Sequence, residues 1–135
     1  MTILCATDLS ENARQAARAA AVLAKGRGSR LMLLHVLDHI GAEQTFADER
    51  LIGPVRRVVE ALASELRAEF GVEVDATVTP GFADETVADI ADHHQVELVV
   101  VGSLGRRKEG RWLLGSVAER TAHLSKVPVL LLPPG

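Results

Sequence analysis

Five short apolar runs, separated by longer segments with helical spacing, constrain the fold of this 135-residue chain most. Four of them are rich in aliphatic residues, as expected of strands buried on both faces of a parallel sheet, and they span residues 3–6, 31–36, 96–101 and 128–132. The fifth, residues 72–79, alternates Val and Ala with charged or polar side chains, which is typical of a strand exposed on one face. We therefore expect this strand at an edge of the sheet.

The segments between these runs are long enough to carry helices. Ser10 is suited to cap the first helix, whose alanine-rich stripe ends near Gly26 and Gly28. Crossovers of this length between parallel strands are right-handed, so we predict an α/β fold: a doubly wound, five-stranded parallel sheet with helices on both faces. No linker or internal repeat divides the chain, and we expect a single domain over residues 1–135.

The composition excludes several classes of function. A net charge of −3, with no interleaving of aromatic and basic residues, argues against binding to nucleic acid. The chain has no apolar stretch of the roughly 18 residues that a membrane span needs and no signal-peptide pattern at its start, so we expect a cytoplasmic location and no membrane partner. The one cysteine, Cys5, lies in the first predicted strand, where it suits a small core residue better than a reactive one.

Glycines follow the predicted strand over residues 96–101 at an informative spacing. Gly102 comes directly after it, Gly105 follows three residues later, and Gly115-Ser116 follows a spacer of nine residues. Glycine has no Cβ, so the backbone at these positions can take a positive φ and its amides can approach an anion closely. Ser116 opens a segment with helical spacing, which would place free amides and a hydroxyl at a helix N-terminus. The spacing predicts a phosphate-binding site beyond the carboxyl ends of the strands.

Motifs of other nucleotide-binding or catalytic sites are not found in the sequence. There is no P-loop pattern, no dinucleotide-binding Gly-x-Gly-x-x-Gly turn after the first strand and no Gly-x-Ser-x-Gly elbow. The five histidines do not have the spacing of a metal site. We therefore assign no catalytic residue and no metal ligand.

The chain resembles the universal stress proteins, in their ATP-binding branch, over essentially all of its length. The resemblance rests on residues 6–10 (Ala-Thr-Asp-Leu-Ser), 33–36 (Leu-Leu-His-Val), 101–105 (Val-Gly-Ser-Leu-Gly), 115–119 (Gly-Ser-Val-Ala-Glu) and 128–130 (Pro-Val-Leu). The glycine spacing is the most specific of these features, because it separates nucleotide-binding members of the family from the others. The resemblance implies the strand order 3-2-1-4-5 and ATP as the ligand, with Mg²⁺ or Mn²⁺ on its phosphates.

The resemblance also implies a role for individual residues. Asp8 would contact the ribose hydroxyls and the backbone of Val36 would pair with the adenine edge, while Ala6 and Thr7 shape the base pocket. Val101, which precedes the first glycine, belongs to the same set. The residues implied for the phosphates are Gly102, Gly105, Arg106, Gly115, Ser116 and Val117.

Two of these assignments have alternatives. Asp8 can instead stabilise the turn before the first helix without touching a ligand. The spacer holds a basic cluster and a tryptophan that depart from the family pattern, and it can hold a triphosphate, contact a partner or form a solvated loop. These residues are Arg106, Arg107, Lys108, Arg111 and Trp112.

We interpret the chain as a regulatory module that binds ATP or a related adenine nucleotide and signals through occupancy. One alternative is a slow ATPase or nucleotidyl-transfer enzyme that uses the basic cluster, and another is a dimerisation module with a vestigial nucleotide site. The apolar strand over residues 128–132 would leave a bare sheet edge, so we expect a homodimer that pairs this strand between subunits.

Overall fold

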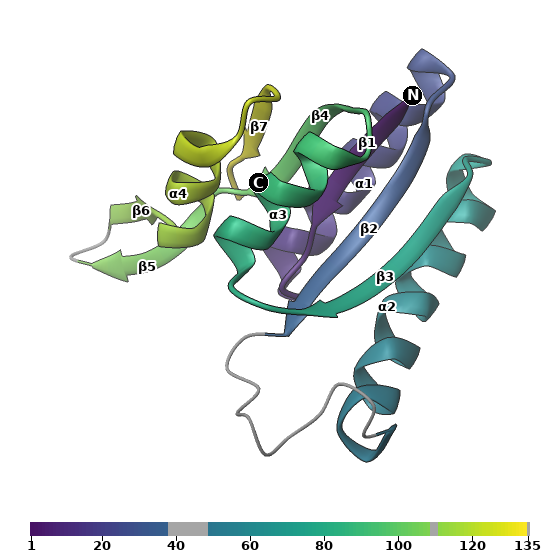
Figure 1. The fold of residues 1–135 in the computed structure, drawn as a ribbon, viewed down its shortest axis with the longest axis horizontal. Helices are drawn as coiled ribbons and strands as arrows, with labels where there is room; N and C mark the ends of the chain where they lie inside the picture. The colour runs from purple at the N-terminus through teal and green to yellow at the C-terminus, as the bar shows by residue number, and fades with distance from the viewer. Residues whose placement is uncertain (38–48, 109–110, 135) are drawn as a thin grey trace.

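A five-stranded parallel sheet forms the centre of the molecule (Figure 1). The computed structural model describes residues 1–37, 49–108 and 111–134, with the backbone alone at 49, 51, 104–108 and 111–114. The strand order is β3-β2-β1-β4-β7, which confirms the order implied by the resemblance. The strands of this sheet are β1 (Thr2–Ala6), β2 (Arg30–Leu37), β3 (Val74–Pro80), β4 (Val96–Gly102) and β7 (Val129–Leu132).

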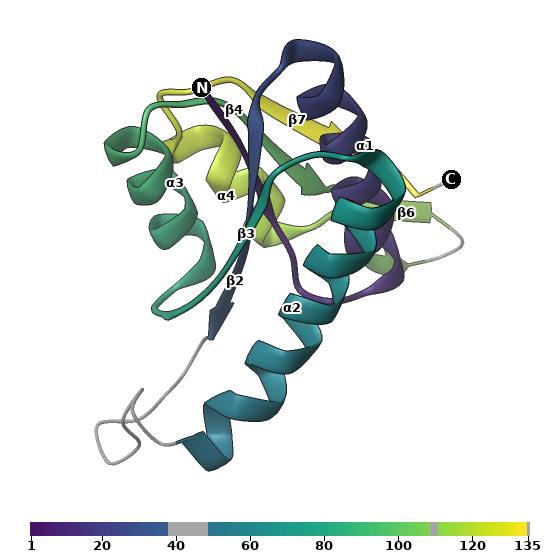
Figure 2. The same ribbon diagram turned by 90° about the vertical axis from the view of Figure 1, so that its right-hand side faces the viewer.

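Helices cover both faces of the sheet, as the sequence predicts (Figure 2). The helices are α1 (Glu11–Arg27), α2 (Glu49–Phe70), α3 (Ala83–His93) and α4 (Ser116–Leu124). The side chains of β1 alternate between two cores: Ile3 and Cys5 pack with α1 and α2, and Leu4 packs with α3 and α4. This alternation follows from the period of two in a strand, and it makes the fold doubly wound.

Local sequence signals set the ends of the helices. Ser10 caps α1, and its Oγ accepts a hydrogen bond of 3.2 Å from the amide of Ala13. Gly28 ends α1 and Gly71 follows α2, both with φ of +66°, a conformation that glycine adopts at little cost. Pro54 lies inside α2, in the second turn of the helix.

The two outer strands of the sheet differ in how apolar they are. β3 is an edge strand, as its alternating pattern predicts, and it pairs with β2 alone. β7 lies at the opposite edge, where it pairs with β4, and Leu130 at its centre is 38% exposed. An outer strand with an exposed aliphatic side chain is suited to pair with a strand of another chain.

The segment between Gly102 and Gly115 forms a β-hairpin, which is not among the elements expected from the sequence. β5 (Leu104–Lys108) and β6 (Arg111–Leu114) pair antiparallel, and Lys108 is opposite Arg111. The hairpin lies beside α4, apart from the five-stranded sheet (Figure 1). A two-residue connection that contains glycine, Glu109-Gly110, is the signal that could have indicated it.

Candidate functional site

The carboxyl ends of β1 and β4 lie side by side at the centre of the sheet. Cys5 pairs with Val100, so that β1 ends at Ala6 next to the end of β4 at Gly102. The chain leaves β1 toward β2 on one side and returns from β3 to β4 on the other side. The strand order therefore reverses between β1 and β4, which is where ligands bind in open α/β sheets.

The turn after β1 is held by its own polar side chains. Thr7, which is 5% exposed, accepts a 3.0 Å hydrogen bond at Oγ1 from the amide of Leu9. Asp8 is exposed, and its Oδ1 accepts a 2.9 Å hydrogen bond from the amide of Ser10. Leu9 has φ of +67°, an uncommon conformation for a non-glycine residue that these bonds support. Asp8 thus stabilises the turn with one carboxylate oxygen, and a carboxylate can accept further hydrogen bonds from a ligand.

The structure gives Gly102 a packing role, which the sequence did not indicate, and its predicted role in anion binding stays a prediction. Its φ is not positive, so a left-handed backbone does not explain the glycine. A Cβ at this position would come within 3.0 Å of Asn12 Cγ and closer still to Oδ1. The missing side chain therefore makes room for Asn12 in the first turn of α1, and it also brings the end of β4 close to the start of that helix.

The start of α4 has no side-chain cap. Gly115 is the N-cap residue, with φ of −63° and ψ of 141°, and as a glycine it provides no side-chain hydrogen bond to the first turn. The amide of Gly115 donates to Ser103 O at 3.0 Å, and its own carbonyl accepts from the amide of Glu119 at 2.9 Å. Helix geometry leaves the amides of the exposed residues Ser116 and Val117 without an intrahelical acceptor, and the helix dipole favours an anion beside them.

The three predicted aliphatic residues that lie on strands line the sheet beneath the site. Ala6 and Val36 are half-buried and pack against the core under α3 and α4. Val101 is 5% exposed and belongs to that core, so its side chain is a packing residue and only its backbone borders the mouth of the sheet. Val36 pairs with Thr79 of β3, one residue before the end of β2.

Two predicted residues, Gly105 and Arg106, lie on β5 in the hairpin. The side chains of β5 and β6, including those of the basic cluster, are outside the described residues. The structure therefore establishes that the spacer is a hairpin, and the phosphate role of Arg106 stays a prediction.

Sequence reasoning missed two side chains that bond at this edge of the sheet. His35 contacts Thr7 O through Nδ1 at 2.8 Å, which ties the end of β2 to the turn after β1. Asn12 donates from Nδ2 to Leu132 O at 3.3 Å. An asparagine in the first turn of an otherwise alanine-rich helix is a weak helix former, and this was the available signal for Asn12.

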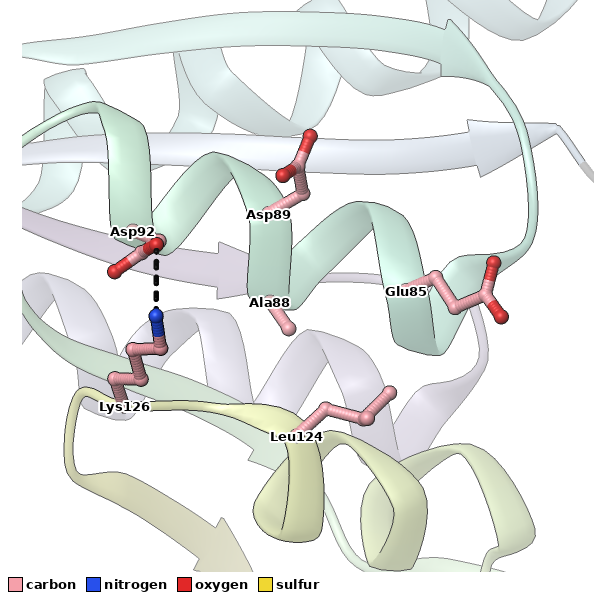
Figure 3. Close-up of a pocket in the computed structure, with 6 residues that line it drawn as sticks. All are labelled: Glu85, Ala88, Asp89, Asp92, Leu124 and Lys126. Carbon is pink, nitrogen blue, oxygen red and sulfur yellow. Dashed lines mark ion pairs between the residues drawn. The ribbon is translucent and has the colours of Figure 1, made fainter.

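A small depression lies elsewhere, between α3 and the end of α4 (Figure 3). Its volume is about 210 Å³, and Lys126 and Asp92 form an ion pair of 3.7 Å across it. None of the predicted site residues lines it. The residues that do are Glu85, Ala88, Asp89, Asp92, Leu124 and Lys126.

Cys5 lies in the core below the carboxyl ends of the strands. Burial raises the pKa of the Cys5 thiol to about 12, because the surrounding core does not solvate a thiolate. Among residues 1–37, 49–108 and 111–134, no group of three His, Cys, Asp or Glu side chains is placed to hold a metal ion.

The comparison with protein families identifies the chain. Residues 1–133 match the model of the universal stress protein family. The chain belongs to this family. The universal stress protein Sll1654 of Synechocystis sp. is 32% identical over 134 residues, an alignment that covers 98% of this chain and 85% of that protein.

Solved structures of the family share this fold. The structure of MJ0577 superposes with a TM-score of 0.84 at 26% identity and covers 99% of this chain and 96% of that one, and the protein of that name is from Methanocaldococcus jannaschii. A universal stress protein from Archaeoglobus fulgidus, solved in complex with dAMP, has a TM-score of 0.76 at 26% identity, with 97% and 96% of the two chains covered. In the part of our chain that the structure describes, no helix has the length and apolar character to cross a bilayer.

Proposed function

We propose that this universal stress protein binds an adenine nucleotide, ATP foremost, at the carboxyl ends of β1 and β4, and that it regulates by occupancy and not by turnover. The proposal covers residues 1–135 as one nucleotide-binding domain. The uncapped start of α4 carries it, since the amides of Ser116 and Val117 are suited to phosphate oxygens. The dAMP complex of the Archaeoglobus fulgidus relative supports adenine nucleotides as the ligand class.

The nucleotide would lie across the reversal point of the strand order. Asp8 follows β1 and would accept hydrogen bonds from the ribose hydroxyls, while Gly102, Gly115 and the first turn of α4 would face the phosphates. The backbone of Val36 would border the base. Mg²⁺ or Mn²⁺, where bound, would be shared with the phosphates and would neutralise part of their charge.

Calorimetric titration with ATP and with 2′-deoxyATP tests the ribose assignment. Asp8→Asn keeps an oxygen that can accept from the amide of Ser10, but it replaces the second carboxylate oxygen with a donor. Asp8→Ala removes both oxygens. We expect roughly micromolar ATP binding by the wild type and a loss of at least about tenfold in each variant, because a hydrogen bond to a charged group contributes about 1.5 to 3 kcal/mol.

The deoxy ligand gives the test its specificity. If Asp8 accepts from the 2′-hydroxyl, the preference of the wild type for ATP over 2′-deoxyATP disappears in Asp8→Ala, as in a double-mutant cycle. Asp89→Ala, at an exposed position of α3, is the matched control and should bind both ligands as the wild type does. Unchanged ATP affinity in Asp8→Ala would remove Asp8 from the site.

We propose in addition that β7 pairs with β7 of a second copy. The observation in favour is the exposed Leu130 at the centre of this outer strand. Leu130→Lys should convert a dimer into a monomer in sedimentation equilibrium, because a charge on an edge strand opposes pairing. A wild type that is monomeric at roughly tens of micromolar would contradict this proposal.

A further inference from the structure

Asn12 is a polar side chain buried at the junction of three elements. It lies in the first turn of α1, is 5% exposed, and donates from Nδ2 to Leu132 O at the end of β7. Buried amides need hydrogen-bond partners, and an unmatched one is costly. The position of Asn12 is therefore coupled to the end of a strand 120 residues away in the sequence.

Gly102 shapes the space that holds Asn12. A Cβ on Gly102 would lie within 3.0 Å of Asn12 Cγ, so an alanine there would displace the carboxamide. Asn12 thus contacts the end of β4 as well as the end of β7. Asn12 belongs to α1, whose N-cap residue Ser10 donates its amide to Asp8 in the preceding turn.

Hydrogen bonds continue from Asn12 to the start of α4. Leu132 O accepts from Asn12 Nδ2 and also from the amide of Ser103, the latter at 2.9 Å. Ser103 O in turn accepts from the amide of Gly115 at 3.0 Å. These contacts form a relay from α1 through β7 and β4 to the N-cap residue of α4.

We propose that Asn12 is a positioning residue for the nucleotide site, which holds the amides at the start of α4 in register with the Asp8 turn. This inference rests on the proposed function. In that function Asp8 binds the ribose, and the amides at the start of α4 bind the phosphates. Asn12 is the side chain that joins the elements carrying these two halves, although it touches neither group of the ligand itself.

This role makes a prediction about ligand length. Adenosine would contact only the part of the site that binds ribose and base, whereas ATP would contact that part and the start of α4 together. Loss of the Asn12 link should therefore weaken ATP and leave adenosine almost unchanged. A general loss of structure would weaken both ligands together, so the ratio of the two dissociation constants separates the two causes.

Asn12→Ala and Asn12→Asp test this by calorimetry with ATP and adenosine. The aspartate variant keeps the shape and replaces the Nδ2 donor with an acceptor that faces Leu132 O. We expect the preference for ATP over adenosine to fall about three- to tenfold in both, which corresponds to the loss of one buried hydrogen bond. Arg14→Ala, in the same part of α1 with an exposed side chain that pairs with Glu65, is the matched control and should keep the wild-type ratio.

Gly102→Ala gives a second route to the same state, because it displaces the Asn12 side chain without changing it. Because Gly102 itself faces the phosphates in the proposed site, this comparison is made without ligand: the effect of Gly102→Ala on the exchange rate of the Gly115 amide should not add to that of Asn12→Ala in the double variant. Additive effects, or a wild-type ratio in folded Asn12→Ala, would overturn the proposal.

Amide hydrogen exchange tests the relay without any ligand. In Asn12→Ala the amide of Gly115 should exchange about three- to tenfold faster, because its acceptor Ser103 O loses the support of the relay. The amide of His94, which donates to Ile90 O within α3, should be unchanged. If the wild type binds no ATP, the proposed function fails, and unchanged exchange at Gly115 would then also reject the relay.

Discussion

The start of α1 follows β1, and the start of α4 is bonded to the residue after the neighbouring strand β4, yet the two helix starts are built in opposite ways. At α1, Ser10 Oγ accepts from the amide of Ala13, and Asp8 accepts from the amide of Ser10 itself. At α4, Gly115 offers no side chain at all. The first arrangement satisfies helix amides within the chain, and the second leaves them for an external acceptor. The anion site that we propose at α4 therefore differs from the capped start of α1 in having no side chain at its N-cap position.

Tertiary contacts hold α4 where a cap holds α1. The amide of Gly115 donates to Ser103 O, which fixes the helix to the end of β4. Farther along, Arg120 forms an ion pair with Asp84, a carboxylate in the first turn of α3 whose side chain is 13% exposed. The start of α4 can thus remain uncapped because its neighbours determine its position.

The substitution Gly115→Asp should produce the largest effect, because it gives α4 the kind of cap that α1 has. The new carboxylate would accept from amides of the first turn and repel phosphate, so ATP affinity should fall by about tenfold or more. Stability should rise by a few tenths of a kcal/mol, since aspartate caps better than glycine. Calorimetry and urea unfolding measure the two effects, which have opposite signs.

Gly115→Ala separates the cap from the bulk of a side chain. The φ of −63° at this position is open to any residue, so alanine should fold normally and weaken ATP less than aspartate does. Wild-type ATP affinity in Gly115→Asp would show that the start of α4 does not bind phosphate, and the contrast between the two helices would lose its functional meaning.

Ser10→Ala removes the cap from α1 and should have the next largest effect. We expect the free energy of unfolding to fall by about 1 kcal/mol, as for other N-cap serines, while ATP affinity changes little. Ser10→Asp preserves an acceptor for the amide of Ala13 and should retain most of the stability. A larger loss of ATP affinity than of stability would mean that the start of α1 also serves the ligand.

Arg120→Ala tests the contact that stands in for a cap at α4. The side chain of Arg120 is 65% exposed and therefore well screened, so we expect a loss of only about 0.5 kcal/mol in urea unfolding. Arg30→Ala breaks an ion pair of 3.3 Å to Glu73, whose two side chains are both more than half exposed, and should cost less. Equal effects of the two substitutions would show that the Asp84 contact does not help to position α4.

Cys5 should show the smallest effect, which is the absence of a reaction. It is buried in β1 just below the mouth of the sheet, and burial raises the pKa of its thiol to about 12. At pH 8 only about one thiol in ten thousand would be ionised, so a thiol reagent should label the native protein only as it unfolds. If the native protein were labelled as fast as the protein unfolded in guanidinium, Cys5 would be accessible to the reagent in the folded state.

Local sequence was sufficient for the sheet and for most helix ends. The aliphatic run at 96–101 and the alternating run at 72–79 indicated a buried and an edge strand, and both were confirmed. Ser10 and Gly28 marked the two ends of α1 correctly. These signals succeed because burial on one or two faces and the satisfaction of helix ends depend on nearby residues.

Only the tertiary structure decided which distant segments contact each other. The sequence by itself determined the doubly wound sheet and pointed to the end of β4 as an anion site, because periodicity and glycine spacing carry that information. It did not reveal that Gly102 makes room for Asn12, or that Leu132 O joins Asn12 to Ser103, since these residues meet only when the sheet is assembled. The space around Gly102 depends on how distant segments pack against each other, and no single position of the sequence determines that packing.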